Sequence, residues 1–317
     1  MPHLKLKLML KLTIGLACQT SLVTQNKMPT CFSKTWQAHG RCTFSKETKL
    51  TEENGFKYSI LASGSTGNVT YIETPKRKIL VDAGLSGKKI EGLMHEIGRS
   101  LSDVDSLLVT HEHKDHVAGL GVLARKYKMD LYANELTWQA IGESCGKVAT
   151  DQKHVFEMGK MLTFGDIDIE SFGVSHDAAA PQFYKFMKDG KSFVMLTDTG
   201  YVSDRMRGTI ENADAYLMES NHDVKILRMG NYPWRLKQRI LSDHGHLSNE
   251  DGASTAISVI GKQTKRIFLG HRSQENNLKE LAHLTMENTL MQHDIDAKNE
   301  VLVLDTSHVE ASPLYHI

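Results

Sequence analysis

A six-residue segment, His111-Glu112-His113-Lys114-Asp115-His116, concentrates side chains that bind metal ions. It directly follows a short apolar run that is typical of a buried strand. In an extended or tight loop alternate residues point the same way, so His111 and His113 can bind one ion while Asp115 and His116 face a second. Imidazole and carboxylate together suit zinc, manganese or iron. The competing interpretation is a polar loop with three chance histidines, and four potential ligands in six residues argue against it.

Three further candidate ligands appear where strands are expected to end. His176 follows an apolar run that ends near Phe172, Asp198 follows the run 194–197, and His271 follows the run 267–270. Each one alone is a weak signal, because a lone histidine at a strand end is more often a turn or hydrogen-bonded residue. After the His-rich segment, however, the three together predict a metal centre built from several strand ends.

In the order of these motifs the chain resembles the metallo-β-lactamase superfamily. That family pattern begins with a strand-end aspartate, matched by Asp82 in Leu80-Val81-Asp82-Ala83-Gly84, and continues with HxHxDH, His, Asp and His. The resemblance implies two divalent metal ions, zinc or manganese with iron as an alternative. It assigns His111, His113 and His176 to the first ion and Asp115, His116 and His271 to the second, with Asp198 bridging. Asp82 would brace the metal loop without binding an ion.

The resemblance is narrower still, to the YycJ/WalJ branch of this superfamily, over roughly residues 56–317. The segments that carry it are 61–68, 81–86, 175–178, 219–223, 245–249 and 273–277. The branch is associated with 5′→3′ exonuclease action on double-stranded DNA. It therefore implies nucleic acid, in the form of duplex DNA, as the partner of this chain.

Glu219 and His246 are the candidate catalytic residues besides Asp82 and Asp198. They resemble the Glu and His that nucleic-acid processing members of the superfamily use as a proton relay. A histidine held by a carboxylate can supply a proton to a leaving oxygen near neutral pH. The competing interpretation gives both residues structural roles only, and His222 and His244 are weaker alternatives for the acid.

Candidate nucleic-acid contacts fall in two regions. The stretch 225–239 holds five cations, no acidic residue and the aromatic residues Tyr232 and Trp234, which would suit phosphates and a base, although a solvated helix face explains it nearly as well. The turn 63–68 could offer backbone N–H groups to a phosphate. The candidates are Ser63, Ser65, Asn68, Asn221, Lys225, Arg228, Arg235, Lys237 and Arg239.

These features predict a dinuclear metal-dependent phosphodiesterase, a 5′→3′ exonuclease on duplex DNA with a role in DNA repair. The alternatives are an RNA-processing nuclease, a thioester, lactone or β-lactam hydrolase on the same fold, and a non-catalytic regulatory module of a two-component system. Lactamases of this fold usually carry a cysteine where Asp198 stands, and degenerate members typically lose ligands. Both points favour a nuclease.

Composition limits the partners. Lys+Arg and Asp+Glu are both 38 among 317 residues, so a nucleic acid would have to be held by a local patch. Four cysteines without a CxxC pair indicate a reducing compartment, and we expect a cytoplasmic protein. Residues 1–55 are expected to be a poorly ordered or leader-like extension, with leader-directed export as the alternative. No membrane span is expected, and the sequence leaves the oligomeric state open.

The predicted fold class is α/β, an αββα sandwich in which two mixed sheets pack face to face with helices on both outer faces. Early strands pair as meanders and later strands alternate with helices, which is typical of two sheets, each covered on one side. Strands are expected over 58–61, 69–72, 78–81, 107–110, 167–172, 193–196, 216–218, 267–269 and 301–304, and helices over 90–97, 117–127, 253–260 and 278–291. Residues 56–317 are expected to form one domain.

Overall fold

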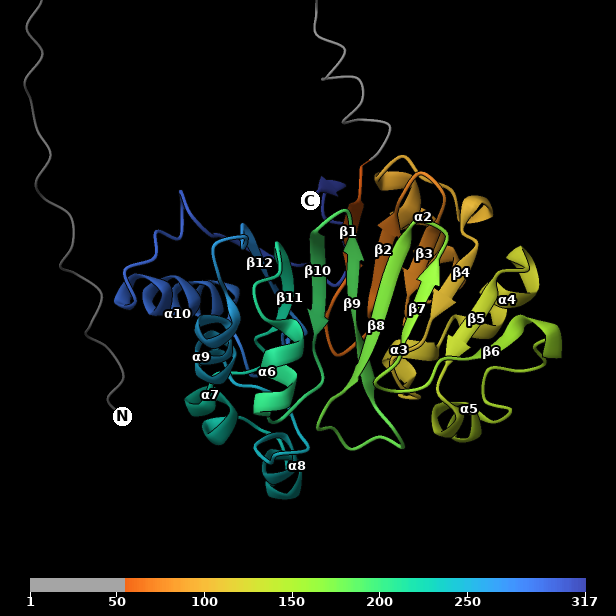
Figure 1. The fold of residues 1–317 in the computed structure, drawn as a ribbon. Helices are drawn as coiled ribbons and strands as arrows, with labels where there is room; N and C mark the ends of the chain where they lie inside the picture. Colours follow the sequence, from red (N-terminus) through yellow and green to blue (C-terminus); the bar gives the residue numbers. More distant parts are fainter. Residues whose placement is uncertain (1–54) are drawn as a thin grey trace, which may run out of the picture. The chain divides into compact units, whose positions relative to one another are not determined.

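The computed structural model describes residues 55–317, which form two seven-stranded sheets (Figure 1). In spatial order the first sheet contains β14 (Tyr315–His316), β1 (Lys57–Ala62), β2 (Val69–Glu73), β3 (Lys78–Val81), β4 (Ser106–Leu108), β5 (Asp130–Ala133) and β6 (Lys153–Val155). The second contains β13 (Leu302–Asp305), β12 (Arg266–Gly270), β11 (Ala215–Glu219), β10 (Lys191–Leu196), β9 (Gln182–Lys188), β8 (Ile167–Gly173) and β7 (Met161–Phe164).

Each sheet changes from antiparallel to parallel pairing across its width. In the first sheet β1, β2 and β3 pair antiparallel, and β3 to β6 pair parallel. In the second sheet β7 to β10 pair antiparallel, and β10 to β13 pair parallel. The carboxyl ends of parallel strands lie at one edge of a sheet, where ligands of open α/β folds commonly bind.

The sheets pack face to face because their central strands are apolar on both sides, as the continuous buried run Ile79-Leu80-Val81 of β3 shows. Ile79 and Val81 of β3 belong to the same buried cluster as Phe193 and Leu196 of β10, whereas Leu80 belongs to a second cluster on the other side of the first sheet. This period of two is what a strand buried on both faces requires. The predicted sandwich of two mixed sheets is confirmed.

Helices cover the outer face of each sheet (Figure 1). The first sheet carries α2 (Gly87–Glu96), α4 (Leu120–Tyr127) and α5 (Glu135–Ile141), and the second carries α6 (Asp204–Ile210), α9 (Asn249–Val259) and α10 (Lys279–Gln292). The short helices α7 (Val224–Met229) and α8 (Trp234–Ile240) lie between β11 and α9 in the chain. Two 3-10 turns, η1 (Leu101–Asp103) and η2 (Thr150–Gln152), complete the elements.

The predicted helix over residues 117–127 is wrong at its start. The segment divides into α3 (Lys114–Val117) and α4, with Gly119 between them. The N–H of Gly119 donates to the carbonyl of Ala83 at 2.7 Å, and a Cβ at this position would lie 2.3 Å from the carbonyl oxygen of Leu85. Gly119 thus packs directly on the backbone that follows β3, and this close approach ends the first helix next to the metal loop.

Two predictions concern the ends of the chain or the membrane. The predicted extension 1–55 lies, apart from Gly55, outside the described residues, so it stays a prediction together with the boundary at residue 56. Within residues 55–317, none of the helices has the length and apolar character that crossing a bilayer requires.

Candidate metal centre and active site

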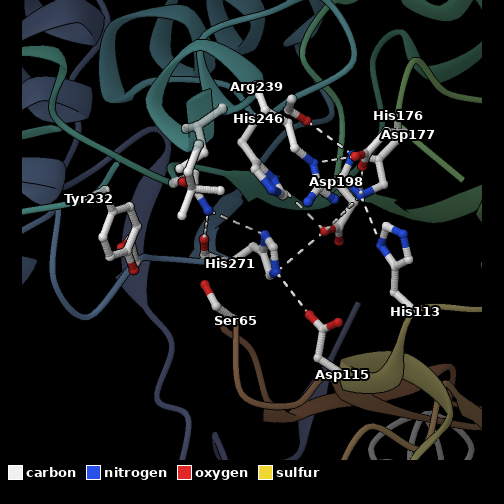
Figure 2. Close-up of a pocket in the computed structure, with 15 residues that line it drawn as sticks. Ser65, His113, Asp115, His176, Asp177, Asp198, Tyr232, Arg239, His246 and His271 are labelled. Atoms are coloured by element: carbon white, nitrogen blue, oxygen red, sulfur yellow. Dashed lines mark hydrogen bonds and ion pairs between the residues drawn. The ribbon is translucent and has the colours of Figure 1, made fainter. Parts of the chain in front are cut away.

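All seven predicted ligands follow strands and come from both sheets. The loop after β4 supplies His111 and His113. The short helix α3, which follows directly, contains Asp115 and His116. The second sheet supplies the other three, after β8, β10 and β12: His176, Asp198 and His271. The structure brings all seven together, as Figure 2 shows for the five that line the pocket.

The first ligand set is His111, His113 and His176, whose facing ring nitrogens lie within 4.8 Å of one another. Nδ1 of His111 contacts Oγ1 of Thr110 at 3.0 Å, so Nε2 of His111 is left to face the site. Nε2 of His176 lies 3.3 Å from Nδ1 of His113. Three imidazoles that converge through one nitrogen each match a three-histidine metal site.

The second ligand set is Asp115, His116, Asp198 and His271, again within 4.8 Å. Nε2 of His271 lies 3.5 Å from Asp115 Oδ2 and 3.3 Å from Asp198 Oδ1. The other oxygen of Asp198, Oδ2, lies 3.3 Å from Nε2 of His116. Asp198 Oδ1 is also 3.9 Å from Nε2 of His176, which belongs to the first set. The carboxylate of Asp198 therefore stands between the two sets.

Unpaired buried atoms show that these residues fit a metal. Nε2 of His111, Nε2 of His271 and Oδ2 of Asp198 are buried and have no hydrogen-bond partner in the structure. Buried polar groups are rarely left unpaired, because each one loses its contacts with water. Here the three atoms point into one nitrogen- and oxygen-lined site, which is the arrangement a divalent cation requires. The described residues thus form a divalent metal-binding site.

Charges within the site shift the pKa values in opposite directions. Burial lowers the pKa of His111 well below its usual value. Burial also opposes the charge on His116, but Asp82, Asp198 and Asp115 outweigh it and raise the pKa of His116. His271 follows the same logic, and the nearby carboxylates, chiefly Asp198, raise its pKa to about 10. The same histidines hold the pKa of Asp198 well below its usual range despite burial.

Asp82 contacts the His-rich loop at two residues, His116 and Thr110. Its Oδ2 lies 2.8 Å from Nδ1 of His116, and its Oδ1 accepts a hydrogen bond from the backbone N–H of Thr110 at 2.9 Å. The hydroxyl of Thr110 contacts both oxygens of Asp82. These bonds fix which nitrogen of His116 faces the site. Such outer contacts commonly orient ligand histidines.

Glu219 holds two histidines with one oxygen. Its Oε1 lies 2.8 Å from Nδ1 of His246 and 3.0 Å from Nδ1 of the ligand His271. Oε2 accepts backbone N–H groups from Thr199 at 3.0 Å and Leu247 at 3.2 Å. Burial raises the pKa of Glu219, but His246 and His271 outweigh it and lower the pKa to about 2. The predicted Glu219–His246 pair is present, and Glu219 also orients a metal ligand.

Gly245 connects this pair to the first ligand set. Its carbonyl oxygen lies 3.1 Å from Nδ1 of His176, and the next residue, His246, donates its N–H to the carbonyl of Ile240 at 3.0 Å. A Cβ at position 245 would lie 2.1 Å from the Ile240 carbonyl oxygen and 2.3 Å from that of Arg239. Only glycine lets the loop lie this close to the end of α8.

Three site residues have left-handed backbone conformations. The φ angles of Asp82, Asp198 and His271 are 62°, 51° and 50°, and each residue follows a strand of the parallel region. Residues other than glycine rarely adopt this conformation, although Asp and His tolerate it better than most. Such backbone strain is concentrated at functional sites. All three residues thus reach the centre through a sharp turn at the end of a strand.

The two ligand sets open into a pocket of about 310 Å³. One wall comes from the segment around α8 and the facing wall from the ligand loops (Figure 2). Its lining residues are Ser65, His113, Asp115, His176, Asp177, Asp198, Asn221, Tyr232, Leu236, Arg239, Ile240, Gly245, His246, His271 and Ser273. A molecule bound in this pocket would thus meet metal-binding side chains, the acid candidate His246 and the aromatic ring of Tyr232.

The predicted nucleic-acid contacts separate into groups. Ser65, Asn221 and Arg239 line the pocket. Ser63 and Asn68 are buried and support the centre instead, since Ser63 Oγ accepts the His271 N–H at 2.8 Å and Asn68 Nδ2 lies 3.1 Å from His116 Nε2.

Three predicted cations, Lys225, Arg228 and Arg235, are exposed on α7 and α8 but do not line the pocket. The prediction for Lys237 is wrong. This lysine is buried, and its Nζ donates to the carbonyls of Arg228 at 2.8 Å and Gly230 at 2.7 Å. Its charge therefore holds α8 to the end of α7 and is not offered to a phosphate.

Two contributing residues were not among the predicted site residues. Thr110 joins Asp82 to His116, and its place just before the His-rich segment was the only available signal. Asp177 lines the pocket and forms an ion pair with Arg239. A carboxylate beside the ligand His176 could have been suspected, but its partner 62 positions away in the chain could not.

Comparisons with known proteins agree with this geometry. Residues 77–271 match the family model described as Beta-lactamase superfamily domain. The chain is 68% identical over 267 residues to Exodeoxyribonuclease WalJ of Streptococcus pneumoniae, covering 84% of this chain and 99% of that protein. It is 55% identical over 236 residues to Exodeoxyribonuclease YycJ of Bacillus anthracis, covering 74% and 89%.

Among solved structures, the metallo-β-lactamase fold protein YhfI from Bacillus subtilis superposes with a TM-score of 0.62 at 14% identity. The match covers 82% of this chain and 100% of that one, and it shows the shared fold. Sequence identity, the matched domain and the assembled ligand sets all lead to the same assignment. The chain belongs to the metallo-β-lactamase superfamily and, within it, to the WalJ/YycJ family of exodeoxyribonucleases.

Proposed function

We propose that this protein is a dinuclear metal-dependent exodeoxyribonuclease that degrades duplex DNA in the 5′→3′ direction. The observation that carries the proposal is the position of Asp198 between two complete ligand sets, in the same pocket as His246. The names of its relatives, exodeoxyribonucleases at 55–68% identity, support DNA as the substrate.

The two ligand sets divide the chemistry. His111, His113 and His176 would hold one divalent ion, and Asp115, His116 and His271 the other, with Asp198 shared between them. When bound, zinc or manganese, with iron as an alternative, lowers the pKa of water and offsets negative charge on phosphoryl oxygens. Asp82 and Glu219 keep His116 and His271 oriented for this role.

His246 donates the proton that the leaving oxygen needs. Its Nδ1 is occupied by Glu219, so Nε2 is the nitrogen left to reach the substrate. The low pKa of Glu219 keeps its carboxylate ionised at neutral pH, so that it accepts a hydrogen bond from Nδ1 of His246 and fixes the orientation of the ring. In cleavage from a 5′ end, this proton would pass to the 3′ oxygen of the released nucleotide.

The test is incubation of the purified protein with 5′- and 3′-labelled duplex DNA, with manganese, with zinc and with chelator. We expect metal-dependent release of nucleotides from the 5′ end, its abolition in Asp198→Ala, and a fall of about 10²–10⁴-fold in His246→Ala. His293→Ala, at an exposed histidine beyond α10, is the matched control and should behave as wild type. Full activity in a folded Asp198→Ala protein would refute the two-metal proposal, and cleavage of RNA in place of DNA would change the substrate.

A further inference from the structure

The pocket holds one permanent cation among several acids. Asp115, Asp177 and Asp198 contribute carboxylates to its lining, whereas Arg239 is the only lysine or arginine among the described lining residues. A DNA strand that enters this pocket brings negative charge close to these acids. Among the lysines and arginines of the described residues, only Arg239 lines the pocket and can meet that charge directly.

In this structure Arg239 is already paired. Nε of Arg239 forms an ion pair with Oδ2 of Asp177, while Oδ1 of Asp177 lies 3.5 Å from Nε2 of the ligand His176 (Figure 2). The carboxylate of Asp177 thus lies between a metal ligand and the single cation. An anionic group of the substrate that contacts both the metal site and Arg239 must lie close to the position that the Asp177 carboxylate occupies here.

The pair is accessible, whereas the helix that carries it is fixed. The side chains of Arg239 and Asp177 are 55% and 30% exposed. Lys237 attaches α8 to α7, and the carbonyl of Ile240 accepts the N–H of His246 at 3.0 Å. A change of partner at Arg239 therefore needs only side-chain rotation, with no movement of the helix.

We propose that Arg239 exchanges Asp177 for a phosphate of the DNA strand when the substrate enters the pocket. Solvent-exposed ion pairs contribute little to stability, so breaking this one costs little. A phosphate offers the guanidinium two oxygens and a geometry that allows paired hydrogen bonds. Asp177 then acts as a competitor that keeps Arg239 in place until a stronger anion arrives. This inference rests on the proposed function, because it names how the same pocket recognises its substrate.

The experiment compares Arg239→Ala, Arg239→Lys and Asp177→Asn in the metal-loaded full chain. Steady-state degradation gives KM and kcat, and fluorescence anisotropy with a duplex carrying phosphorothioate linkages at its 5′ end gives Kd at several salt concentrations. We expect Arg239→Ala to raise KM and Kd roughly tenfold and to reduce the salt dependence of binding by about one counterion. Arg239→Lys should be intermediate. Asp177→Asn should lower KM and Kd a few-fold, because the competitor is lost.

An exposed ion pair elsewhere supplies the matched control. Arg207 and Asp204 of α6 form an exposed arginine–aspartate ion pair, and neither lines the pocket. Arg207→Ala and Asp204→Asn should leave KM and Kd unchanged. A raised KM in Asp177→Asn would overturn the exchange and leave Asp177 as a support for Arg239. Unchanged Kd in Arg239→Ala would overturn it as well. Either result, with wild type still degrading DNA, would leave the proposed function intact, whereas a wild type inactive on DNA would end both.

Discussion

The carbonyl oxygen of Gly245 lies 3.1 Å from Nδ1 of the metal ligand His176. The adjacent residue is the acid candidate His246, whose N–H donates to the end of α8. One backbone segment therefore sets the orientation of a metal ligand, the position of the acid and the distance to the helix that bears Arg239. Metal binding and proton donation share this support, so a small displacement there should affect both.

Gly245→Ala tests this coupling. The added Cβ would lie 2.1 Å from the Ile240 carbonyl oxygen, so the loop must move away from α8. We expect kcat/KM to fall by about a hundredfold, because misplacement of catalytic groups by an ångström has effects of that size, and metal affinity to fall with it. Gly92→Ala on α2, where a Cβ meets no atom within 4 Å, is the control and should retain full activity. Normal metal content with normal kcat in Gly245→Ala would refute the coupling.

Glu219→Gln should impair two functions at once, because Glu219 Oε1 contacts both His246 and His271. We expect a loss of kcat and, in addition, about 10- to 100-fold weaker metal binding. His246→Ala should lower kcat and leave the metal content unchanged. Elemental analysis of metal per chain, alongside kinetics, separates the two effects. If Glu219→Gln and His246→Ala bind metal equally well, Glu219 serves only the acid.

Metal binding should release protons and strengthen with rising pH. The pKa of His271 is raised to about 10 in the metal-free site, so its imidazole carries a proton at neutral pH. A metal ligand must be deprotonated, and the apparent affinity should therefore rise up to about tenfold per pH unit between pH 7 and 9. Calorimetry in buffers of different ionisation enthalpy measures the protons released. An affinity that does not change over this range would contradict the expected proton release.

His222 should make the fold sensitive to mild acid. It is buried, its Nε2 has no hydrogen-bond partner, and burial lowers its pKa to about 4. The unfolded chain binds the proton near pH 6.5, before the folded protein does, so stability is full above that value and falls as the pH drops towards 4. The loss should reach up to about 3 kcal/mol, from 1.36 kcal/mol per pKa unit. Urea unfolding at pH 7 and pH 4.5 should show a smaller difference for His222→Gln than for wild type.

Lys237→Met should reduce stability without reducing DNA affinity. The ammonium of the buried Lys237 donates to two backbone carbonyls, and its loss should cost on the order of 2 kcal/mol in the free energy of unfolding. Arg235→Ala, two residues earlier in α8 and exposed, should change stability by less than about 0.5 kcal/mol. Urea titrations measure both. If a folded Lys237→Met protein binds DNA many-fold more weakly than wild type, Lys237 is a DNA contact, as the sequence predicts.

The metal centre could be predicted because its ligands follow apolar strands. His111, Asp198 and His271 each come directly after or within two residues of such a run, and strand ends are readable from local sequence. The strands β8, β10 and β12 were predicted almost to the residue for the same reason. By contrast β9 was not predicted, since Lys185 and Lys188 in its second half conceal a strand that is well buried at its start.

Contacts between distant residues could not be predicted. Local sequence gives no sign that Lys237 turns inward, because a lysine among cations resembles any solvated helix face. The contact between Glu219 and His271 is equally hidden, since the two residues lie 52 positions apart in the chain, and the Glu219–His246 pair was indicated only by the family resemblance. The left-handed turns at Asp82, Asp198 and His271 also leave no local signature, because tertiary packing imposes them.

The division of the ligands between the two sheets affects how the protein is made. The first sheet supplies four of the seven ligands, and the last ligand in chain order, His271, follows β12 of the second sheet. A nascent chain on the ribosome therefore lacks a complete second ligand set until β12 and His271 have been synthesised. Fragments cut between the two halves by a protease share this deficiency. Any copy of the molecule that stops before His271 therefore lacks a ligand of the second set and cannot assemble the complete centre.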